Sequence, residues 1–216
     1  PKGLVPVLAH DGDIITESNA IVEYLEEVFA DAPLLSQSAV KRAHARVWLI
    51  RLDAGLHEQV AVISFCVAFR HQLLQRHSTA ESLQGFFSRI PDPARRAVME
   101  DIVTNGMESR RLYFAALAYD KVIKDMASAL EKSEWLVDGK ISLADFAMFP
   151  YIERLDQLQL CDWWAQYPQL REWLTRMRDM QAYKTGVEEW NNPSYIQLMQ
   201  ETGAGAWPKM KALLAA

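Results

Sequence analysis

The chain has 216 residues, 50% of them hydrophobic, which is enough for one large domain or for one domain with part of another. Its 28 acidic and 23 basic residues give a formal net charge of −5, which excludes the basic surface of a nucleic-acid-binding protein and a polybasic membrane anchor. The cysteines, Cys66 and Cys161, both have apolar or aromatic neighbours, so we expect buried thiols, no disulfide framework and a reducing, cytoplasmic setting. We find no run of membrane-spanning length and no basic leader, and we therefore expect no membrane partner.

A β-hairpin is predicted at the start of the chain. Residues 4–8 (LVPVL) and 14–16 (IIT) are short and rich in β-branched side chains, and Asp11-Gly12 between them is typical of a tight hairpin turn. Pro6 cannot donate to a strand ladder, so it must lie at an edge or at a special position. The residues alone do not decide whether the Val5–Pro6 bond is cis or trans.

An amphipathic helix is predicted from about Ser18 to Phe29, because apolar residues recur there at helical spacing. The first amides of this helix have no acceptor within the helix, and an anion fits at such an end. Glu17 would bind an ammonium group, so that Glu17 and Ser18 together suit the zwitterionic end of an amino-acid-like ligand. The simpler alternative is that Ser18 caps its own helix and Glu17 is solvated.

A break at residues 32–38 (APLLSQS) separates this start from a long helical region, so we place the domains at 1–32 and 38–216. The pattern predicts a helix over residues 39–75 that bends near Gly55, followed by a short helix with a capping box from Ser78 to Glu81 and another that starts at Asp92-Pro93. Further helices are expected over 105–132, after Lys140 and over 169–181. The fold class is therefore α+β, with a small hairpin unit followed by an all-α domain.

Aromatic residues are frequent in the helical region, where they would either wall an aromatic pocket or belong to the core. The histidines and cysteines lack the spacing of metal ligands, so no metal site is expected. The rings concerned are Trp48, Phe65, Phe69, Phe86, Phe87, Tyr113, Phe114 and Tyr119.

Residues 1–8 (PKGLVPVL), Asp11-Gly12 and residues 17–25 (ESNAIVEYL) resemble the second half of the N-terminal, thioredoxin-like domain of glutathione transferases. The resemblance implies a cis-proline after valine, and a glutathione site formed by the Val5 main chain, Pro6, Glu17 and Ser18. Leu4 departs from the pattern, since many members carry Lys or Gln there for the glycine end of glutathione. The resemblance also implies that the unit with the thiol-activating residue precedes Pro1, so we expect an N-terminally truncated chain whose catalytic residue is unknown.

Residues 135–145 (WLVDGKISLAD) resemble the folding motif of the same family, and they also form a capping-box variant with Ser142 as N-cap and Asp145 at N3. Residues 167–174 and 182–184 resemble a late helix of the family. A narrower resemblance, carried by residues 41–48 (KRAHARVW), the excursion 78–107 and the extended tail, is to the bacterial β-etherases of lignin degradation.

These resemblances imply an enzyme that uses the glutathione thiolate on a hydrophobic aromatic electrophile, with β-aryl ether cleavage as one form of the reaction, and a homodimer when full length. The alternative is a non-catalytic glutathione transferase-like module for protein association.

Overall fold

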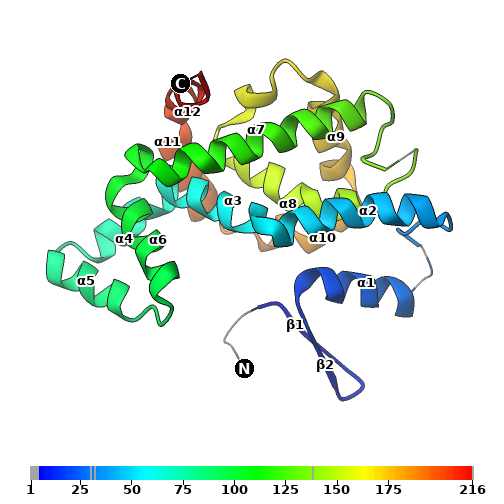
Figure 1. Ribbon diagram of the computed structural model, residues 1–216, viewed down its shortest axis with the longest axis horizontal. Helices are drawn as coiled ribbons and strands as arrows, with labels where there is room; N and C mark the ends of the chain where they lie inside the picture. Colours follow the sequence, from blue (N-terminus) through cyan, green and yellow to red (C-terminus); the bar gives the residue numbers. More distant parts are fainter. Residues whose placement is uncertain (1–4, 30, 32, 138, 216) are drawn as a thin grey trace.

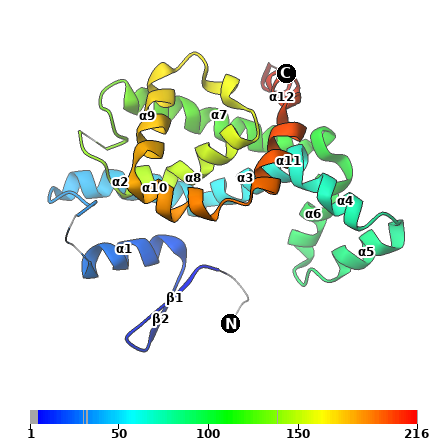
Figure 2. The ribbon, with the colours of Figure 1, turned by 180° about the vertical axis from the view of Figure 1, so that it is seen from behind.

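We describe the protein from a computed structural model, which describes residues 5–29, 31, 33–137 and 139–215. A two-stranded hairpin and one helix lie beside a larger helical bundle (Figure 1; from behind in Figure 2). In chain order the elements are β1 (Val7–His10), β2 (Asp13–Thr16), α1 (Ser18–Val28), α2 (Ala39–Arg51), η1 (Leu52–Leu56), α3 (His57–Ser64), η2 (Phe65–Phe69), α4 (Arg70–Arg76), α5 (Ala80–Ser88), α6 (Pro93–Asn105), η3 (Gly106–Glu108), α7 (Arg110–Leu130), α8 (Leu143–Gln157), η4 (Cys161–Trp164), α9 (Pro168–Asp179), α10 (Gln181–Gly186), η5 (Glu188–Trp190), α11 (Pro193–Gly203) and α12 (Ala206–Ala215).

The predicted hairpin is confirmed. Strands β1 and β2 pair antiparallel from Val7 opposite Thr16 to His10 opposite Asp13. The turn residues Asp11 and Gly12 both have positive φ, 50° and 92°, as a two-residue hairpin turn that follows the strand twist requires. The hairpin rests on α1, where His10 Nδ1 lies 2.7 Å from the Tyr24 hydroxyl.

The long helix predicted over residues 39–75 is present as five helical segments, α2 to α4 with η1 and η2 between them. The segments η1 and η2 are π-helical, and Gly55 within η1 has a φ of 120°, which places the predicted bend where the sequence indicated. By length and composition alone, Ala39–Arg76 would be able to cross a membrane, contrary to the sequence-based expectation. Half of its most apolar window is buried within the protein, however, as in a core helix.

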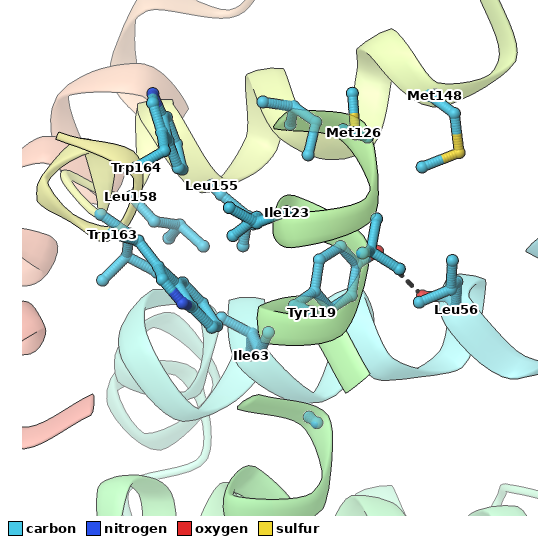
Figure 3. Close-up of a cluster of buried hydrophobic side chains, with 14 of the residues drawn as sticks. Leu56, Ile63, Tyr119, Ile123, Met126, Met148, Leu155, Leu158, Trp163 and Trp164 are labelled. Atoms are coloured by element: carbon cyan, nitrogen blue, oxygen red, sulfur yellow. Dashed lines mark hydrogen bonds between the residues drawn. The ribbon is translucent and has the colours of Figure 1, made fainter. Parts of the chain in front are cut away.

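The core of the bundle forms where α3, α7 and α8 meet (Figure 3). Tyr119 on α7 is fully buried, and its hydroxyl donates a 3.0 Å hydrogen bond to the Leu56 carbonyl at the end of η1. Trp48 and Phe87 are also core residues, so three of the eight candidate pocket rings belong to the core. Phe65, Phe69, Phe86 and Tyr113 are half-buried and Phe114 is 52% exposed.

The capping box at the start of α8 is confirmed by reciprocal hydrogen bonds between Ser142 and Asp145. The Asp145 carboxylate is fully buried and also accepts hydrogen bonds from the Leu136 amide at 3.0 Å and the Trp173 indole at 2.9 Å. Burial raises the pKa of Asp145, and these donated hydrogen bonds oppose the rise. One carboxylate therefore ties the loop before α8 to α9, which fixes how α8 enters the core.

Three sequence-based expectations were wrong in detail. Thr79, not Ser78, caps α5, through a 3.2 Å hydrogen bond from the Ser82 amide. Helix α7 begins at Arg110 rather than near residue 105, because Ser109 caps it. Cys66 is buried as expected, but Cys161 is exposed at the start of η4.

Candidate functional site

The register of the hairpin brings the four predicted ligand-binding residues to one end of it. Val7 pairs with Thr16, so Val5 and Pro6 leave β1 at the end where Glu17 and Ser18 leave β2. The Val5–Pro6 peptide bond is cis, as the family resemblance implied. Val5 is 91% exposed, and Pro6, Glu17 and Ser18 are exposed as well, so a ligand has access to this end of the hairpin. Leu4 lies outside the described residues.

Glu17 has a backbone conformation that non-glycine residues rarely adopt. Its φ is 69° and its ψ is 118°, and it occupies the N-cap position of α1. A residue held in such a region costs of order 1–3 kcal/mol and is typical of ligand sites. The strained residue is thus one of the two that the sequence singled out as a zwitterion-binding pair.

Ser18 is the first residue of α1 rather than its N-cap, and the N-cap residue Glu17 makes no side-chain cap hydrogen bond. The interpretation in which Ser18 caps its own helix is therefore wrong. The first amides of the eleven-residue helix α1 point out of its N-terminus, where the helix dipole favours an anion, and Ser18 is exposed at this end.

The helical domain holds this end of α1 in place through residues that sequence reasoning missed. Asn19 Nδ2 donates to the Leu49 carbonyl at 3.1 Å and to the Asp53 carboxylate at 2.8 Å. Farther along α1, the Arg46 guanidinium binds both Glu23 carboxylate oxygens, with N–O distances of 2.8 to 3.1 Å. Because no local pattern marks a contact between residues thirty positions apart, the sequence carried no signal for it.

Beside these contacts, a cavity of about 510 Å³ lies between α1 and α2. Three carboxylates and one guanidinium contribute to its wall, so the cavity carries a net negative charge. Its lining residues are Asn19, Ala20, Glu23, Tyr24, Glu27, Arg46, Leu49, Ile50 and Asp53.

On the helical domain, the Asp53 carboxylate is also close enough to Tyr151 to affect the pKa of its phenol. Burial raises the pKa of the Tyr151 phenol, and the carboxylates of Asp53 and Glu58 raise it further. The Tyr151 hydroxyl lies 3.2 Å from His57 Nδ1. A neutral phenol and an imidazole thus stand at the part of the helical domain that receives the N-terminus of α1.

The thiols of the chain are poor candidates for the reactive group. Burial raises the pKa of Cys66 to about 12, and burial also raises that of Cys161. Within the described residues no group of His, Cys, Asp or Glu has the arrangement of a metal site.

Comparison with protein families gives a match at each of the two regions. A model described as the glutathione S-transferase N-terminal domain matches residues 1–33, and one described as the glutathione S-transferase C-terminal domain matches residues 110–176. These two regions are similar to the two domains of the glutathione transferase superfamily. Its cofactor is glutathione, and the strained Glu17 beside a helix N-terminus fits the amino and carboxylate groups of that tripeptide.

Among individual relatives, Protein LigF of Sphingobium sp. strain SYK-6 is 27% identical over 209 residues, which covers 93% of this chain and 80% of LigF. The crystal structure of beta-etherase LigF from the same strain matches with a TM-score of 0.74 at 28% identity, covering 88% of this chain and 79% of that one. FtsZ-localized protein A of Caulobacter vibrioides is 24% identical and covers 85% of this chain and 70% of its own. These similarities support a glutathione transferase activity in general.

Proposed function

We propose that the exposed end of the hairpin binds glutathione and that the enzyme directs its thiolate at an aromatic electrophile, with β-aryl ether cleavage as the specific reaction. The observation that carries the proposal is the positive φ of Glu17, next to a helix N-terminus without a side-chain cap. Such a strained residue persists where a ligand site needs it.

Each residue has a distinct role in this proposal. The α1 amides and the Ser18 hydroxyl donate to the γ-glutamyl carboxylate, and the Glu17 carboxylate accepts from the ammonium group. The exposed main chain of Val5, ahead of Pro6, offers an amide and a carbonyl to the peptide part of glutathione. Bound glutathione supplies a thiolate that forms a carbon–sulfur bond as the carbon–oxygen bond of an aryl ether breaks and phenoxide leaves.

The aromatic side of the proposal rests on two half-buried rings of the helical domain. Phe65 and Phe69 stand edge to face, with their centroids 5.7 Å apart. A phenol keeps its proton at neutral pH, and burial raises the pKa of Tyr151 further, so its hydroxyl is available to donate to an oxygen of the substrate. The similarity to beta-etherase LigF is the reason for placing ether cleavage ahead of other glutathione transfers.

The domain division at 1–32 and 38–216, the cytoplasmic location and the homodimer belong to the same proposal. Exposed apolar side chains on α2 and α7 support the dimer, since such residues otherwise face water. They are Val40, Val47, Ile50, Phe114 and Leu117. Sedimentation at micromolar concentration should give the mass of two chains, and a single chain would contradict the dimer.

Calorimetric titration with glutathione tests the binding site. Glu17→Gln and Ser18→Ala should each weaken binding by roughly 10-fold or more, the worth of one hydrogen bond to a charged group. Glu81→Gln, on the exposed surface of α5, should leave it unchanged. No detectable binding at millimolar glutathione would contradict the site and favour a protein-association module.

A second assay separates ether cleavage from general conjugation. The complete protein, glutathione and several β-aryl ether ketones should release a phenol that is measured by absorbance. If glutathione binds but none of these ethers is cleaved, the protein is a transferase of another specificity.

A further inference from the structure

The arginines of the chain differ in how their charge is compensated. Seven arginines among the described residues are half-buried. Six of them donate to an oxygen of a carboxylate or a main-chain carbonyl: Arg42, Arg51, Arg70, Arg96, Arg176 and Arg178. Arg154 is the exception.

The Arg154 guanidinium lies 5.3 Å from the centre of the Phe69 ring, and its Nη1 donates to the sulfur of Met199. A thioether is a weak acceptor, and a ring face accepts no conventional hydrogen bond from the remaining donors of the planar guanidinium. No carboxylate of the described residues lies within ion-pair distance of Arg154. Its cation is therefore only partly compensated, and burial accordingly lowers its pKa.

The neighbouring acid is already committed elsewhere. The Glu153 carboxylate accepts from Arg178 at 2.9 Å and from the Tyr183 hydroxyl at 3.3 Å. Glu153 is also 5% exposed, so it has little freedom to turn toward Arg154. The remaining Arg154 donors are not buried from water, so an acceptor on another molecule can reach them.

The position of Arg154 relates it to the proposed site. It follows Tyr151 by three residues on α8, so the two side chains share one face of the helix. Tyr151 lies at the junction with α1 through His57 and Asp53. The Phe69 ring, over which the Arg154 guanidinium lies, packs edge to face with Phe65. Arg154 thus lies with the Phe69 and Phe65 rings, and Tyr151 lies one turn away on the same helix.

We propose that Arg154 determines substrate specificity by binding the carboxylate of an aromatic acid whose ring lies against Phe65 and Phe69. A planar guanidinium matches a carboxylate with two parallel hydrogen bonds, and a half-buried position strengthens them relative to water. The inference rests on the proposed function, because it names the substrate class of that aromatic site.

The test uses equilibrium binding of 2-naphthoate and of 2-naphthamide, which have nearly the same shape and differ in charge. Binding to the complete protein is followed by calorimetry. The protein should bind the acid at least roughly 10-fold more tightly than the amide, and Arg154→Met should remove that preference while leaving the affinity for the amide within a few fold. Arg154→Lys should retain part of it, since an ammonium keeps the charge but not the two-pronged geometry.

Arg110→Met is the matched control, because Arg110 lies 5.7 Å from the centre of the Phe114 ring at the exposed start of α7. This variant should keep the preference, and thermal melting should show that both methionine variants are folded. Equal binding of acid and amide by the unaltered protein, or an unchanged preference in Arg154→Met, would overturn the inference. Because the assay contains no glutathione, it can contradict the role of Arg154 without contradicting the glutathione site, and the glutathione titration can do the reverse.

Discussion

Asp145→Asn should be among the most destabilising single substitutions in this protein. Oδ1 of Asp145 accepts from Leu136 and Trp173, and Oδ2 accepts from the amide and the hydroxyl of Ser142, at 2.9 to 3.0 Å. Asparagine keeps one oxygen and turns an NH₂ group toward one pair of donors. Two buried donors then lose their acceptor, at about 1–3 kcal/mol each.

The total loss in the free energy of unfolding should be about 3–5 kcal/mol, the usual range for breaking a buried charged network. For a chain of this size, 1 kcal/mol corresponds to about 2–4 °C in Tm, so we expect a decrease of roughly 6–20 °C. Scanning calorimetry measures it. Ser142→Ala, which removes one cap hydrogen bond, should cost only about 1 kcal/mol and serves as the matched control.

The pH dependence gives a second check. Because burial raises the pKa of Asp145 in the folded protein, its contribution to stability is fully present below the unfolded carboxyl pKa of about 4 and declines as pH rises through the folded value. The advantage of the unaltered protein over Asp145→Asn should therefore be largest in acid. A Tm decrease no larger than that of Ser142→Ala would refute the account of the network.

Two further outcomes follow from thiol burial and from close packing. The pKa of Cys66 is raised to about 12, because its thiol is buried, whereas Cys161 is exposed. An aromatic disulfide reagent at pH 8 should therefore modify one thiol per native chain, Cys161, and a second thiol only after denaturation. Rapid modification of both thiols in the native protein would contradict the burial of Cys66. A Cβ on Gly203 would overlap the Leu158 carbonyl, so Gly203→Ala should lower the free energy of unfolding by about 1–3 kcal/mol. Gly85 is the control, because nothing lies within 4 Å of a Cβ added there. Gly85→Ala should raise the free energy of unfolding by no more than about 1 kcal/mol.

Local patterns determined much of this protein. The Asp11-Gly12 turn, the bend at Gly55, the Asp92-Pro93 helix start and the Ser142–Asp145 capping box were all predictable, since each depends on residues within one or two turns of each other. A local pattern of the same kind marked Glu17 and Ser18, at the start of a helix, as a candidate ligand site.

Element boundaries were less predictable. Thr79 rather than Ser78 caps α5. Helix α7, capped by Ser109, begins at Arg110, five residues later than the apolar pattern indicated. Neighbouring residues of the same capping type compete within one or two positions, and the outcome depends on which geometry the packed helices allow.

Only the tertiary structure decided what surrounds the site. The hydrogen bond from Asn19 to Asp53 joins the two regions, and no periodicity in the chain records it. The same is true of Arg154, which is an ordinary helix residue in the sequence and becomes a partly uncompensated cation only because Phe69 and Met199 pack around it. The sequence determined which groups the chain carries, whereas folding determined which of them found partners, because burial and pairing are properties of residues brought together from distant positions.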